Sequence, residues 1–171
     1  MKALLDRLSG PIHVALAVFT LLLLASSPWL NMVKRLPTPA GFVNLSHIAL
    51  GLAALLLVAV YLVTCSLGGR WQLYFPWLAG RLGAVGRDLG GLARGRLPAV
   101  EGGGLFAMVE GLLLLSLLAT GLTGAGWLML QGADMAIAWS DVHGLLARCF
   151  AGLLLLHLLA VSLHLLDFVR G

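Results

Sequence analysis

Three histidines interrupt an otherwise apolar segment, DVHGLLARCFAGLLLLHLLAVSLHLLDFVR, at positions His143, His157 and His164. They are separated by fourteen and then by seven residues. In a helix that turns ~100° per residue, these spacings fall about 40° and 20° short of whole turns, so the three rings lie on one stripe. The helical rise of ~1.5 Å per residue separates His143 from His157 by about 21 Å. Imidazoles commonly ligate haem iron, and this separation fits two haems stacked in the two halves of a membrane.

The composition places the chain in a membrane. Of its 171 residues, 60% are hydrophobic and 11% are charged, and the mean hydropathy is +1.00. Four segments reach the ~20 helical residues that cross a hydrocarbon core of ~30 Å. We therefore expect an all-α integral membrane four-helix bundle, as a single domain over residues 1–171. The expected spans are 11–30, 42–67, 105–130 and 138–169. The first span lacks a small-residue cleavage site, so we do not expect it to be a cleaved signal peptide.

Basic residues are unequally divided between the two sides of the expected spans. Lys34 and Arg35 lie on one side, and Arg148 falls within the fourth span. The positive-inside rule places both termini and the connecting loop 68–104 in the cytoplasm. Part of this loop, residues 77–95, is expected to form an interfacial helix. The sequence has no basic surface interleaved with aromatic residues, so we expect no nucleic-acid partner. The eight basic residues on the cytoplasmic side are Lys2, Arg7, Arg70, Arg81, Arg87, Arg94, Arg96 and Arg170.

All five histidines lie within the expected spans, where an ionisable side chain is costly and indicates function. His47 and His143 both begin a span on the outer side, so they can share one iron. His13 lies near the inner end of the first span, and the inner half of the fourth span offers either His157 or His164. A single buried histidine is often only a packing residue, but five at paired depths favour a cofactor. A metal-transport site would usually add carboxylates at mid-membrane, where this chain has none.

Three stretches of sequence carry a resemblance to a known family. They are DRLSGPIHVALAVFTLLLL, LLATGLTGAGWLM and VHGLLARCFAGLLLLH. Over nearly its whole length the chain resembles the bacterial cytochrome b561 and Ni,Fe-hydrogenase cytochrome b superfamily, which includes the gamma subunits of formate dehydrogenases. The resemblance implies two haem b groups in the bacterial cytoplasmic membrane. It implies that His47 and His143 ligate the outer haem iron and that His13 and His157 ligate the inner one. His164 stays the alternative inner ligand.

The resemblance also implies a function, electron transfer across the bilayer between a periplasmic redox partner and the quinone pool. Quinone is expected on the inner side. Glu110 lies about six residues into the third span and His164 about six residues from the end of the fourth. The two groups therefore share a depth at which they could handle the protons of a quinone. Whether the chain is an enzyme in its own right or an electron-transfer subunit of an oxidoreductase stays open.

Two other functions compete with this prediction. One is a stand-alone superoxide:quinone oxidoreductase, and the other is a non-redox membrane transporter or scaffold. The outer loops combine Asp134 and Asp141 with Lys34 and Arg35, which gives no dense positive cleft to steer an anion. This balance favours a partner protein, such as a periplasmic oxidoreductase or cytochrome subunit, alongside quinone and membrane lipid. Arg148 lies about 140° from the histidine stripe and receives no role.

Overall fold

The computed structural model describes residues 2–67, 69, 71–98 and 103–170. These residues form two compact units, and three of the long helices contribute residues to both units. Unit 1 comprises residues 1–64 and 116–150, and unit 2 comprises residues 65–115 and 151–171. Several residues counted on the cytoplasmic side lie outside the described part. These are Arg70 and the side chains of Lys2, Arg7 and Arg170.

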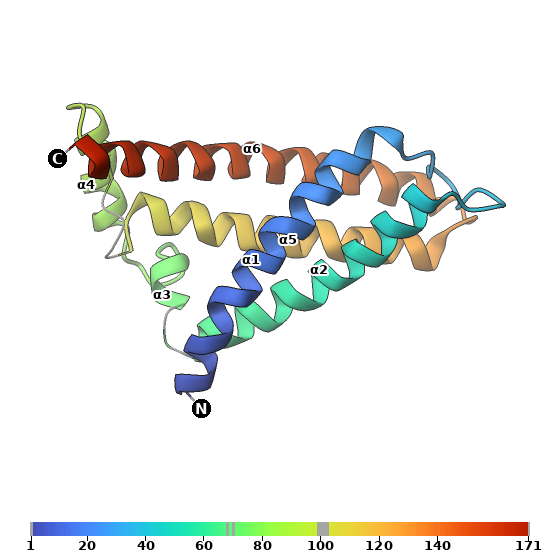
Figure 1. Ribbon diagram of the computed structural model, residues 1–171, viewed down its shortest axis with the longest axis horizontal. Coiled ribbons are helices and arrows are strands. Elements are labelled where there is room, and N and C mark those ends of the chain that lie inside the picture. The colour runs from blue at the N-terminus through green and yellow to red at the C-terminus, as the bar shows by residue number, and fades with distance from the viewer. Residues whose placement is uncertain (1, 68, 70, 99–102, 171) are drawn as a thin grey trace. The chain divides into compact units, whose positions relative to one another are not determined.

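The described residues fold entirely as helices and connections, which confirms the all-helical prediction (Figure 1). Within the described ranges, four helices are long and apolar enough to cross a membrane, with spans at Gly10–Trp29, Phe42–Ser66, Leu105–Leu130 and Met135–Leu166. At most 22% of the residues in each span are buried within the protein. The apolar side chains that remain exposed therefore have lipid as their natural surroundings. The four helices are α1 (Lys2–Ser26), α2 (Phe42–Leu67), α5 (Leu105–Leu130) and α6 (Met135–Arg170).

The helix boundaries match the sequence prediction for α2 and α5, whereas those of α1 and α6 differ from it. α1 ends at Ser26, before the expected end at Leu30, and α6 ends at Arg170, just after the expected end at Val169. α1 begins at Lys2, so Pro11 lies inside the helix rather than in its first turn, where we expected it. A proline inside a helix removes one backbone hydrogen bond, and the remaining bonds of a 25-residue helix carry the chain through. α6 begins at Met135, three residues before the expected start at Ala138. The side on which the termini lie stays a prediction.

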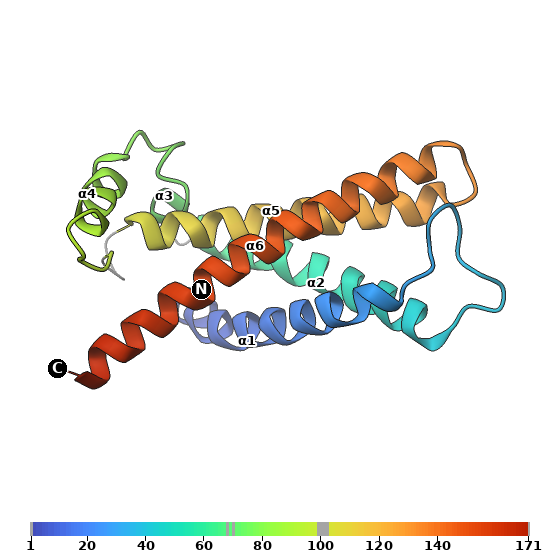
Figure 2. The ribbon, with the colours of Figure 1, turned by 90° about the horizontal axis from the view of Figure 1, so that it is seen from above.

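In unit 1, α1 and α2 lie side by side, as Figures 1 and 2 both show. Leu23 of α1 is the nearest side chain to Gly51 of α2, 3.9 Å from where a Cβ atom would stand. The second half of α5 packs closely on α2, because a Cβ atom added to Gly121 would stand only 3.0 Å from the Leu55 side chain. Small residues at such contacts let membrane helices approach without side-chain obstruction.

In unit 2, two short helices precede α5. They are α3 (Trp71–Tyr74) and α4 (Gly83–Leu92), and α4 lies within the segment 77–95 where we expected an interfacial helix. Asp88 of α4 accepts a hydrogen bond of 2.8 Å from the backbone N–H of Leu105, the first residue of α5. The first N–H groups of a helix have no partner inside it, so this carboxylate caps α5.

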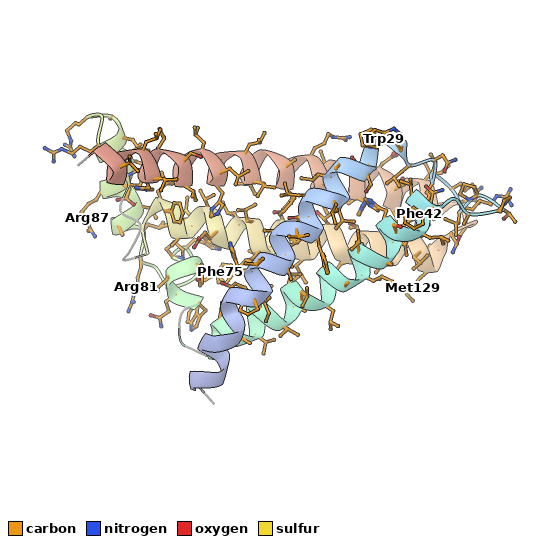
Figure 3. All side chains as sticks on the ribbon, viewed as in Figure 1. Trp29, Phe42, Phe75, Arg81, Arg87 and Met129 are labelled. Carbon is orange, nitrogen blue, oxygen red and sulfur yellow. The ribbon has the colours of Figure 1, made fainter. Side chains whose placement is uncertain are left out.

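Arginines of the same loop are directed away from this contact. The side chains of Arg81 and Arg87 extend into the surroundings (Figure 3). Their exposure agrees with a location at a membrane surface, where a guanidinium can reach phosphate and water.

Candidate functional site

His47 and His143, the two residues expected to share an iron, come together in unit 1. His47 lies in the second turn of α2, and His143 lies in the third turn of α6. Both imidazoles are half-buried in unit 1, and each has a close contact through its Nδ1. Helices that are distant in sequence thus bring two potential iron ligands into one compact unit.

The hydrogen bond of His143 decides which of its ring nitrogens is available. Its Nδ1 lies 2.9 Å from the backbone carbonyl oxygen of Thr120 on α5. A carbonyl oxygen only accepts, so Nδ1 carries the proton and donates it. The Thr123 hydroxyl lies further away, at 3.4 Å, beside the same nitrogen. In this tautomer the Nε2 lone pair is free of the proton and can bind a metal.

His47 has the same arrangement with a side-chain partner. Its Nδ1 lies 2.9 Å from Oγ of Ser26, the last residue of α1. The Ser26 hydroxyl also lies 3.1 Å from the carbonyl oxygen of Leu23, to which it can donate its single proton. With the proton placed there, Ser26 accepts from Nδ1–H of His47, which is the arrangement that leaves the Nε2 lone pair of His47 available to a metal.

A glycine-rich stretch of α5, GLTGAG, seats the ring of His143. A Cβ atom on Gly124 would stand 3.0 Å from Cε1 and 3.2 Å from Nδ1 of His143. A Cβ atom on Gly126 would run into the indole ring of Trp139. A side chain at Gly126 would therefore force the Trp139 ring to move, whereas one at Gly124 would require the His143 ring to shift by a few tenths of an ångström. Small residues at both positions let the rings of α6 pack against the α5 backbone.

The connection between α1 and α2 is fastened to the far end of α5 and to the turn that follows. Trp127 donates from Nε1 to the carbonyl oxygen of Val33, at 2.8 Å. Lys34 pairs with Asp134 at 3.0 Å. Near the start of α2, Asn44 donates to Asn31 at 2.6 Å. These contacts hold the start of α2, where His47 lies, in a fixed relation to α5 and its glycines.

Large apolar side chains surround this end of unit 1. Trp29, Phe42 and Met129 are 71%, 84% and 86% exposed, and each extends away from the helices (Figure 3). Such side chains are typical of the interface between lipid and water, which agrees with the end of a membrane span.

His13 and Arg148 have different surroundings. The side chain of His13 on α1 is exposed in unit 1. Its expected partner His157 belongs to unit 2, so this ligand pair stays a prediction. Arg148 is also exposed, and its guanidinium folds back along α6, 3.8 Å from where a Cβ atom of Gly144 would stand.

In unit 2, one aromatic ring contacts both remaining histidines. The ring centroid of Phe106 lies 5.3 Å from that of His157 and 5.9 Å from that of His164. The His164 ring meets Phe106 edge-on, at 80°, and its Nε2 is buried with no hydrogen-bond partner among the described residues. Glu110 follows Phe106 by one turn of α5 and is half-buried. His164 and Glu110 are therefore associated with the same face of α5.

Sequence reasoning missed four residues that position these groups. Glu110 and the five histidines stood out because ionisable residues are rare in spans. A hydroxyl at the end of a helix, or a phenylalanine among leucines, gives no comparable signal. Thr120 lies in LLATGLTGAGWLM, one of the three stretches that carry the family resemblance, and its backbone carbonyl oxygen contacts His143. The missed residues are Ser26, Asp88, Phe106 and Gly124.

The chemistry of the His47–His143 pair fits haem iron. Six-coordinate haem takes two axial ligands, and both imidazoles have Nδ1 bound and Nε2 available. A family model described as prokaryotic cytochrome b561 matches residues 6–167. Neither the comparison with curated proteins nor that with solved structures gives a match. The chain belongs to the prokaryotic cytochrome b561 family, membrane b-type cytochromes that use haem in transmembrane electron transport.

Proposed function

We propose that the chain is a dihaem b-type cytochrome that carries electrons between a periplasmic redox partner and the quinone pool. Both termini and the loop 68–104 face the cytoplasm. This orientation is supported by the distribution of arginine and lysine across the expected spans. The outer haem is bound by His47 and His143, and the inner haem by His13 and His157, with His164 as the alternative inner ligand.

The observation that carries this proposal is the hydrogen bonding of the outer pair. Bound haem supplies an iron centre that accepts and releases one electron. The protein orients each ligand by holding Nδ1–H, at 2.9 Å to Ser26 for His47 and at 2.9 Å to the Thr120 carbonyl for His143. Such contacts fix the tautomer and the ring direction before the metal binds, and they raise the basicity of the ligating nitrogen.

The proposed quinone site lies near the start of α5 in unit 2. Phe106 offers an apolar ring beside His164, and the buried Nε2 of His164 has no hydrogen-bond partner in the described part of the chain. A quinone oxygen could be that partner. Reduction of a quinone to a quinol takes up two electrons and two protons, so the site needs groups that deliver protons. We assign this role to His164, whose ring contacts Phe106, and to Glu110, which lies one turn after Phe106 on α5.

The charges near the outer loops favour a protein partner over superoxide. Lys34 is paired with Asp134 at 3.0 Å, which neutralises one of the two basic side chains in the loop between α1 and α2. An enzyme that attracts a small anion gains from unpaired positive charge around its entrance. The pairing therefore supports a function in which this chain passes electrons to or from a larger periplasmic oxidoreductase or cytochrome.

Haem content of ligand variants tests the proposal. His47→Ala and His143→Ala should each lose about one of the two haems, because six-coordinate iron needs both imidazoles. His13→Ala should lose the other one. Pyridine haemochrome assays on protein purified in a mild detergent give the haem-to-protein ratio. The proposal is wrong if His47→Ala and His143→Ala both retain the haem content of the unmodified chain.

A further inference from the structure

We infer that Ser26 is a positioning residue that sets the redox potential of the haem bound by His47. The inference rests on the proposed function, since it needs the iron to be bound by His47 and His143. It adds a residue from a third helix, α1, to a site whose ligands come from α2 and α6.

The geometry gives Ser26 a defined role in the hydrogen bond. Its Oγ lies 2.9 Å from Nδ1 of His47. The same hydroxyl lies 3.1 Å from the Leu23 carbonyl, within the same helix, and can donate its proton there. When His47 binds iron through Nε2, its Nδ1 carries the proton, so Ser26 accepts from Nδ1–H and the Leu23 carbonyl takes the serine proton.

The two ligands differ in how replaceable their partners are. His143 donates to a backbone carbonyl, that of Thr120, which no side-chain substitution removes. His47 donates to a side chain, which a single substitution does remove. The serine is therefore the point at which the sequence can adjust the electronic character of one axial ligand and leave the other unchanged.

The direction of the effect follows from the chemistry of imidazole. A hydrogen bond accepted from Nδ1–H moves electron density toward Nε2 and makes that nitrogen a stronger donor. A stronger donor stabilises ferric iron more than ferrous iron, so the hydrogen bond lowers the reduction potential. Removing the acceptor should raise the potential of one haem, while iron stays six-coordinate.

The chain provides a matched control in the adjacent residue. Ser27 also has a hydroxyl that donates to a carbonyl, that of Leu24 at 2.9 Å, and it forms no hydrogen bond with a histidine among the described residues. Ser26→Ala and Ser27→Ala therefore remove the same group from neighbouring positions. Ser26→Thr keeps the hydroxyl and should restore the original behaviour.

The experiment is a spectroelectrochemical titration of the haem-loaded chain in detergent. Ser26→Ala should shift one of the two haem waves upward. A hydrogen bond worth about 0.5–1.5 kcal/mol changes the ratio of reduced to oxidised haem at a fixed voltage by roughly two- to tenfold. Tenfold corresponds to about 59 mV for one electron. The second haem wave of Ser26→Ala should be unchanged. Both waves of Ser26→Thr and of Ser27→Ala should match those of the unmodified chain. If Ser26→Ala loses haem, Ser26→Cys carries the test, because sulfur is a weak acceptor of similar size.

Two outcomes overturn the inference, namely a fully loaded Ser26→Ala or Ser26→Cys with unchanged waves, and an equal shift in Ser27→Ala. Failure of the proposed function looks different. In that case the unmodified chain binds no haem, or His47→Ala keeps both haems.

Discussion

Gly124→Ala tests whether the α5 backbone seats the His143 ring. The added Cβ atom would stand 3.0 Å from Cε1 and 3.2 Å from Nδ1 of His143. Ordinary van der Waals contact begins at 3.4 Å, so the ring must retreat by a few tenths of an ångström. The hydrogen bond from Nδ1 to the Thr120 carbonyl, at 2.9 Å, would be strained by the same movement.

The expected magnitude comes from two opposing terms. Overpacking at a tight helix contact typically costs about 1–3 kcal/mol. Replacing glycine by alanine within a helix returns about 1 kcal/mol of helix propensity. The net effect on overall stability should therefore be a loss of about 0–2 kcal/mol. The gain in helix propensity does not offset a displacement of the His143 ring in the free energy of haem binding. A cost of about 1–3 kcal/mol in that free energy weakens haem binding roughly 5- to 150-fold.

The assay is the haem-to-protein ratio at limiting haem, together with the rate at which haem is lost to an excess of apomyoglobin. Gly152→Ala is the matched control, because it lies in a helix with nothing within 4 Å of the new Cβ atom. Gly124→Ala should lose one haem much faster than Gly152→Ala does. Equal haem content and equal loss rates in the two variants would refute the proposed seating of His143.

The remaining predictions concern unit 2. His157→Ala should lose the inner haem, whereas His164→Ala should keep both haems. In stopped-flow traces, His164→Ala should slow haem oxidation by a quinone analogue ~10²- to 10⁴-fold. If His164→Ala loses a haem and His157→Ala does not, His164 is the inner ligand and His157 is the residue beside the quinone. Asp88→Ala removes the acceptor 2.8 Å from the Leu105 N–H and should cost about 0.5–2 kcal/mol, seen as a lower thermal midpoint. Asp88→Asn keeps an acceptor oxygen and should lose less, and an unchanged midpoint in Asp88→Ala would count against the cap.

The helices could be predicted because their pattern is local. Runs of apolar residues bounded by LPTPAGF and EGGGLF give the limits of α2 and of α5, and both starts agree with the structure. The predicted start of α1, at Pro11, was wrong. The helix begins at Lys2 and continues through this proline. The length and hydropathy of a segment predict whether it spans a membrane far better than they predict the residue at which its helix begins.

The candidate site could be predicted only in its ligands. The spacing of residues along one helix predicts the side of the helix on which His143 lies. It does not predict which residue of another helix His143 contacts. The contacts that orient the ligands join residues more than twenty positions apart, from His47 to Ser26 and from His143 to Thr120. Such contacts depend on how helices pack, and packing in a membrane is set by small residues such as Gly124 rather than by a repeating pattern.

A reduced-minus-oxidised absorption spectrum of the purified chain, combined with a pyridine haemochrome assay, decides whether this protein is the dihaem cytochrome proposed here. We expect the α and Soret bands of low-spin b-type haem, with two haems for each chain, and we expect those bands to respond to added quinol. A chain that is folded and helical, was produced with ample haem, and yet shows no b-type bands would contradict the account.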